Sequence, residues 1–85
     1  CHNGAEEANM AMGYQYDKRV GERVRRAREK KGLTQAQLAA RLQVRGCDLT
    51  RSALAKIEAG QRHVYALEIK VLKEVLGVTF DDLLP

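Results

Sequence analysis

The chain has 85 residues, of which 45% are hydrophobic and 31% are charged, and its 15 Lys and Arg against 11 Asp and Glu give a net charge of +4. A domain of this size buries only about 60% of its unfolded surface, which argues against a deep, enclosed catalytic site. No apolar run approaches the roughly 20 residues that a membrane-spanning helix needs. The N-terminal residues lack the pattern of a secretory signal, and we expect a cytoplasmic protein.

The positive charge is concentrated in the middle of the chain. Residues 17–63 contain 13 bases and five acids, for a net charge of +8, whereas residues 1–16 and 64–85 each contribute −2. A basic block between acidic ends predicts one positively charged face, which is typical of a protein that binds a polyanion. A charged run by itself is more often the solvated side of a helix, so the charge alone does not identify a function.

Residues 1–16 are small or polar and have no hydrophobic period. They are interpreted as a disordered tail, or as a remnant of cloning or processing, and are left out of the predicted fold. From Asp17 onward the pattern becomes helical, because Val20, Val24 and Ala27 recur at helical spacing. Gly32 supplies the stop of this first helix.

Two threonines mark the starts of the next two helices. Thr34 and Gln37 have the spacing of a capping box, and the helix that they begin is predicted to extend through Val44. Gly46 then turns the chain, and Thr50 caps a third helix. These two helices, joined by a turn, have the pattern of a helix-turn-helix.

The last part of the chain predicts two more helices. Residues 66–76 have apolar residues on one side and are followed by Gly77, and Thr79 caps a short final turn. Tyr65 stands where a capping residue is expected, so the start of the fourth helix is predicted to be weak. No segment alternates as a strand would, and residues 17–85 therefore predict an all-α domain of five short helices.

In a helix-turn-helix, the first helix lies across the DNA backbone and the start of the second reaches base edges in the major groove. Such a recognition helix needs an apolar side that packs on the protein, here Leu54 and Ile57. It also needs an opposite side, its front, whose short side chains can form hydrogen bonds. The residues that supply this front are Thr50, Arg51, Ser52, Ala55 and Lys56.

Several short segments, in the right order, resemble the Cro/phage-repressor type (XRE family) of helix-turn-helix DNA-binding domain. They are GERVR at 21–25 followed by Arg28, GLTQAQLA at 32–39, LAKIEAG at 54–60 and LGVTFDDLL at 76–84. The resemblance implies a compact five-helix bundle of the lambda-repressor-like type.

The sequence departs from this family between the second and third helices. Residues 43–49 stand where a turn of about three residues is usual, so a lengthened turn is expected there. We expect this turn to place Arg45 and Cys47 in a protrusion near the DNA-binding face. Cys47 is interpreted as an incidental free thiol rather than a redox switch.

The resemblance also implies roles for individual residues. Gln35 matches a glutamine that braces against a DNA phosphate, and Arg62 matches a loop position that meets phosphate. Arg51 is the main candidate for reading a base, because a guanidinium can bind guanine O6 and N7 together. Thr50 and Ser52 match the groove-facing start of the same helix.

Four further positions complete the predicted site. Ala55 matches a contact position, although its methyl group can only touch a thymine methyl, and Lys56 stands beside it. Arg28 and Glu58 match a largely buried salt bridge between the first and third helices, which is a structural role. For each of the DNA-contact positions, the plain alternative is a solvent-exposed residue with no ligand.

The leading functional hypothesis is sequence-specific binding of double-stranded DNA by a bacterial or phage transcriptional regulator. A single module buries only about 600–1,000 Å², so useful affinity implies a homodimer, which nothing in the sequence establishes. The alternative is a protein-interaction module of the same fold, such as an antitoxin or an adaptor, that does not read bases.

An enzyme is the weakest hypothesis. His2 and His63 have no nearby nucleophile and acid, and the two cysteines do not have zinc-ligand spacing. No phosphate-cradling glycine loop is present. The sequence therefore predicts no catalytic residue, metal, cofactor or small-molecule substrate.

Overall fold

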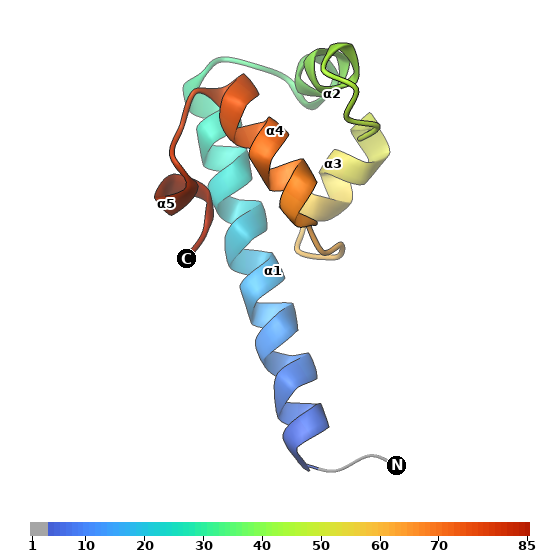
Figure 1. Cartoon of the computed structure of the whole chain (residues 1–85), viewed down its shortest axis with the longest axis vertical. Helices are drawn as coiled ribbons and strands as arrows, with labels where there is room; N and C mark the ends of the chain where they lie inside the picture. The colour runs from blue at the N-terminus through green and yellow to red at the C-terminus, as the bar shows by residue number, and fades with distance from the viewer. Residues whose placement is uncertain (1–3) are drawn as a thin grey trace.

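The computed structural model describes residues 4–85, and the side chains of residues 15–85. Its five helices are α1 (Gly4–Lys30), α2 (Gln35–Val44), α3 (Arg51–Glu58), α4 (Ala66–Leu76) and α5 (Phe80–Leu83). Residues 4–85 contain no strand, which confirms the all-α prediction. Figure 1 shows α3, α4 and α5 gathered around the C-terminal half of α1, with α2 closing one end of the bundle. In this part of the chain, no helix is long and apolar enough to cross a bilayer.

The first helix is longer than the sequence predicts. It begins at Gly4 rather than near Asp17, and its N-terminal half projects from the bundle (Figure 1). The helix thus includes residues 4–16, which the sequence analysis left out of the predicted fold, while residues 1–3 lie outside the described residues. The sequence pattern misses this half because a hydrophobic period indicates burial, and a projecting helix is not buried. Its turns add to an existing helix, which avoids the cost of nucleation. The assignment of the DNA-binding domain to residues 17–85 stays a prediction.

The threonine caps are confirmed. Thr34 Oγ1 accepts the N–H of Gln37 at 3.1 Å, and the Gln37 side chain accepts the N–H of Thr34 at 2.9 Å. Thr50 Oγ1 accepts the N–H of Ala53 at 3.1 Å, and Thr79 caps α5 in the same way. These caps satisfy backbone donors that would otherwise lack a partner, so the starts of α2 and α3 are well defined.

The start of α4 is held by a side chain that the sequence did not single out. The Glu68 carboxylate accepts the backbone N–H of Tyr65, the residue before the helix, at 3.0 Å. This bond ties the first turn of α4 to the loop before it, which the prediction of a weak start did not include. Arg62 in turn donates two hydrogen bonds of 2.9 Å to the two oxygens of Glu68. This hydrogen bonding from Arg62 is the main cause that lowers the pKa of Glu68 below its ordinary value.

The link between α2 and α3 folds against the core instead of protruding. Gly46 has φ +80°, and the N–H of Cys47 donates to the carbonyl of Leu42 at 2.9 Å, as in a Schellman motif. This motif turns the Cys47 side chain back toward Leu42, and both belong to the buried core. The predicted protrusion is therefore wrong for Cys47, whose burial raises the pKa of its thiol. Arg45 is exposed, but it pairs with Glu74 of α4 at 3.1 Å.

One hydrophobic core joins all five helices. Its largest fully buried side chains are Val20, Val24, Leu38, Leu42, Leu49, Leu54, Ile57, Leu72 and Leu83. At the crossing of α1 and α3 there is no room for a side chain on Gly21, because a Cβ there would overlap the carbonyl oxygen of Ile57. This close approach sets the position of α3 relative to α1.

Candidate nucleic-acid interface

The third helix has two chemically distinct sides. Successive residues of an α-helix are rotated by about 100° about its axis. On this basis the buried Leu54 and Ile57 share one side of α3 with the partly buried Ala53 and Glu58. The opposite arc, about 140° wide, holds only exposed residues. These are Arg51, Ser52, Ala55, Lys56 and, just after the helix, Ala59.

Thr50 lies exposed at the start of α3, where it is first of all the cap. Its hydroxyl oxygen accepts the N–H of Ala53, and a hydroxyl that accepts in this way can still donate its own proton. The hydroxyl of Thr50 can therefore serve both the helix and a ligand.

The start of α2 lies next to the start of α3. Gln35 and Arg51 line the same shallow groove, together with Arg28, Glu29, Gly32, Leu33, Thr34 and Ala36. The N–H groups in the first turn of a helix have no acceptor within that helix, and they carry partial positive charge. The groove thus combines helix N–H groups with the guanidinium of Arg51, a combination suited to an anion.

Arg28 and Glu58 form a buried ion pair between α1 and α3. Arg28 donates two hydrogen bonds, of 2.8 and 2.9 Å, to the two carboxylate oxygens of Glu58, and a third to the carbonyl of Leu33 at 2.8 Å. The side chains are 12% and 5% exposed. The hydrogen bond to Glu58 is the main cause that raises the pKa of Arg28 above its ordinary value. The pair joins α3 to α1 and to the turn before α2.

Gln35 belongs to the same network, which the sequence did not indicate. Its side-chain amide donates to Glu58 Oε1 at 3.1 Å. This bond joins α2 to α3, and it leaves the amide oxygen and one N–H of Gln35 for a ligand. No local pattern could reveal it, because 23 residues separate the two partners.

Arg62 is engaged inside the protein. Besides its two hydrogen bonds to Glu68, its guanidinium donates to the carbonyl of His63 at 3.0 Å and lies 5.7 Å from the ring centre of Tyr65. Its side chain is half-buried, and hydrogen bonding to Glu68 raises its pKa. The structure therefore gives Arg62 a role in holding the loop between α3 and α4.

The basic block of residues 17–63 divides into two groups. Five of its 13 bases bind carboxylates or carbonyls of the protein: Arg23, Arg25, Arg28, Arg45 and Arg62. The other eight bases are exposed, and Arg51 and Lys56 of these lie on α3. The charge count alone therefore overstates the number of bases that a polyanion could meet.

A family model of the helix-turn-helix matches residues 24–83, which is well over half of the 85 residues. No curated protein and no solved structure matches the chain. The matched segment contains α2 to α5 and the end of α1. The order of these helices, the paired threonine caps and the exposed front of α3 agree with that match, and the chain belongs to the Cro/C1-type (XRE) family of helix-turn-helix DNA-binding domains.

Proposed function

We propose that this domain binds double-stranded DNA at specific sequences, as a bacterial or phage transcriptional regulator, with α3 in the major groove. Family membership supports DNA binding in general. The observation that carries the finer proposal is the exposed arc of α3, which begins with Arg51 beside the start of α2.

In this proposal the exposed arc reads bases. Arg51 donates to O6 and N7 of a guanine, a bidentate contact that is worth about 1–3 kcal/mol of discrimination against a wrong base. Ser52 and Thr50 offer hydroxyls to neighbouring base edges or phosphates. Ala55 lies nearer the middle of the exposed arc, where its methyl group can pack on a thymine methyl. Lys56 lies at the margin of the arc, nearer the phosphates.

Phosphate binding is assigned to the start of α2. The first-turn N–H groups supply partial positive charge, and Gln35 braces the adjacent phosphate with its remaining amide groups. Because Glu58 already holds the Gln35 amide at 3.1 Å, less side-chain freedom is lost on binding. A phosphate contact by Arg62 stays a secondary proposal, because it would compete with Glu68.

Useful affinity requires two such domains on one site. A single module buries only about 600–1,000 Å² on DNA. We therefore propose a homodimer on a two-fold operator with half-sites about 34 Å apart, which is one turn of the duplex.

Selection from random duplex sequences followed by sequencing tests the proposal. A palindromic motif is expected, with log affinity falling against log salt at a slope near −5 for about six phosphate contacts. Arg51→Ala should weaken binding to the selected site about 5- to 150-fold and relax the preference at one base. The matched control is Arg19→Ala, an exposed arginine that lies on α1 near Pro85, and it should leave the base preference unchanged.

A protein-interaction module is the second candidate, and one feature favours it. Ala55 and Ala59 are both exposed within the arc of α3, and a small apolar patch also suits contact with a protein. The lengthened turn gives this candidate no support, because Cys47 is packed into the core. A gel shift with random duplex separates the two functions, since an adaptor should show no salt-sensitive binding to DNA.

A further inference from the structure

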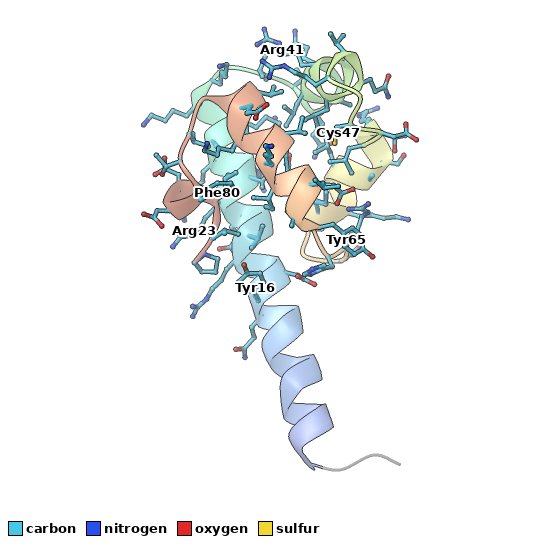
Figure 2. All side chains as sticks on the ribbon, viewed as in Figure 1. Tyr16, Arg23, Arg41, Cys47, Tyr65 and Phe80 are labelled. Carbon is cyan, nitrogen blue, oxygen red and sulfur yellow. The ribbon has the colours of Figure 1, made fainter. Side chains whose placement is uncertain are left out.

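An apolar groove of about 490 Å³ lies away from the proposed DNA-binding surface. Its walls come from α1, α4, α5 and the loop before α4. Figure 2 shows two of the side chains that line it, Tyr16 on α1 and Phe80 on α5. Among the described residues, none that lines the groove belongs to α2 or α3, so an occupant of the groove leaves the exposed arc of α3 accessible.

The groove is held in shape by the core. Three of its lining residues, Val20, Val64 and Ile69, are 2%, 8% and 5% exposed and belong to the hydrophobic core. Phe80 is exposed, but the Lys73 ammonium lies 4.8 Å from its ring centre and restrains it. A concave apolar site of this volume that exists before its ligand arrives is typical of small-molecule binding.

Among the described residues that line the groove, Lys70 supplies the one charge that has no partner. The acid of the wall, Asp17, is bonded to His63 at 2.8 Å. Glu68 and Glu74, the acids on the same helix as Lys70, are both bonded to arginines. Lys70 is exposed and forms no ion pair within residues 15–85, so its ammonium is free to meet an anion.

We propose that this groove binds a small amphipathic anion, an aromatic ring system that carries one carboxylate. The rings pack against Tyr16 and Phe80, because aromatic side chains offer both apolar area and favourable ring contacts. The carboxylate pairs with the Lys70 ammonium in a charge-assisted hydrogen bond. Residues 17–85 contain 15 bases and nine acids, a net charge of +6, which attracts an anion and repels a cation.

Titration of the whole chain with 2-naphthoate, in the absence of DNA, tests the site. The matched neutral compound is 2-naphthalenemethanol, which has the same rings and no charge. In NMR spectra, amide shifts should change at Val20, Val64 and Ile69 and stay constant on α3. The dissociation constant of 2-naphthoate should be about 1 mM or tighter, which is the ordinary binding efficiency for a ligand of this size. The neutral compound should bind about threefold more weakly, because it lacks the ion pair.

Lys70→Gln removes the ammonium and keeps the rest of the groove. Its affinity for 2-naphthoate should fall about threefold, to that for 2-naphthalenemethanol, while the neutral compound binds as it does to the wild type. Lys30→Gln is the control, because it removes the charge of an exposed lysine that lies outside the groove. It should keep the preference for the anion, and the same spectra report whether each variant is folded.

Equal affinity of the wild type for the anion and its neutral counterpart would overturn the site. An equal loss of preference in Lys30→Gln and Lys70→Gln would do the same, since only the overall charge would then matter. Shift changes centred outside the groove also contradict it. So does an affinity for 2-naphthoate that falls as the protein concentration rises, because a second copy of the chain would then cover the groove.

The titration separates this site from the proposed DNA binding, because no DNA is present. A wild type that binds 2-naphthoate in the groove but binds no duplex contradicts the regulator and leaves the site intact. A wild type that binds duplex DNA but not 2-naphthoate contradicts the site and leaves the regulator intact.

Discussion

The ion pair between Arg28 and Glu58 offers the sharpest test of how α3 is held. In Arg28→Ala, Glu58 loses both of its hydrogen bonds from the guanidinium, and the carbonyl of Leu33 loses a third. The Glu58 carboxylate, only 5% exposed, then keeps a single hydrogen bond, from Gln35. Breaking a buried pair by removing one partner costs about 3–5 kcal/mol, because a charge is left buried without compensation.

A loss of this size is large for such a small domain. Proteins of this length have a total stability of about 4–13 kcal/mol. The melting temperature of Arg28→Ala should therefore fall by roughly 12–40 °C. Urea denaturation followed by circular dichroism at neutral pH measures the change in the free energy of unfolding directly.

Two further variants make the measurement specific to burial. Arg25→Ala also breaks an ion pair, to Glu29 at 3.6 Å, but those side chains are 62% and 54% exposed, so it should cost about 0.5 kcal/mol or less. The double variant Arg28→Met with Glu58→Leu should regain most of the lost stability, since it leaves no unpaired charge. The reasoning is refuted if Arg28→Ala loses no more stability than Arg25→Ala.

Three other predictions follow from the packing and the pKa shifts. Gly21→Ala should lower the free energy of unfolding by about 1–3 kcal/mol, because its methyl group would overlap the backbone of α3 and force the helices apart. The control Gly46→Ala meets no neighbouring atom and suffers only backbone strain, so it should cost about 1–2 kcal/mol and leave DNA affinity unchanged. Equal DNA affinity of the two variants would contradict the role of Gly21 in the crossing of α1 and α3. The pKa of Glu68 is lowered mainly by the hydrogen bond from Arg62, so its contribution to stability is present above the ordinary pKa of a glutamate and is lost as the pH falls through the lower folded value. The difference in the free energy of unfolding between the wild type and Glu68→Gln should therefore shrink as the pH falls below about 4.3, and a difference independent of pH would argue against this role. Burial raises the pKa of the Cys47 thiol. In a variant whose N-terminal cysteine is replaced by serine, a thiol reagent should therefore modify the native protein much more slowly than the urea-unfolded chain. Equal rates would show that the thiol is open to solvent.

The two sides of α3 account for both stability and the proposed function. Leu54, Ile57 and Glu58 attach the helix to the core and to α1, whereas Arg51 and Ser52 are exposed. Substitutions on the first side should change the free energy of unfolding. Substitutions on the second side should change DNA binding with little effect on stability, because exposed side chains away from packed contacts contribute little.

Local signals in the sequence determined the helices and the exposed front of α3. Thr34, Thr50 and Thr79 cap helices as predicted, and Gly32 and Gly77 end them with φ of +77° and +68°. These signals act between residues at most a few positions apart, so the chain can be read one turn at a time. The recurrence of apolar residues likewise determines which side of a helix is buried.

Only the tertiary structure decided the partners of Gln35 and Arg45 and the path of the long turn. Gln35 meets Glu58 across 23 positions, and Arg45 meets Glu74 across 29, distances over which no local pattern applies. The sequence analysis also wrongly placed Cys47 in a protrusion, whereas the structure packs it in the core that several helices share. The apolar groove is a product of the same assembly: Tyr16, Leu67 and Phe80 lie far apart in the chain and come together only because three helices pack around one core.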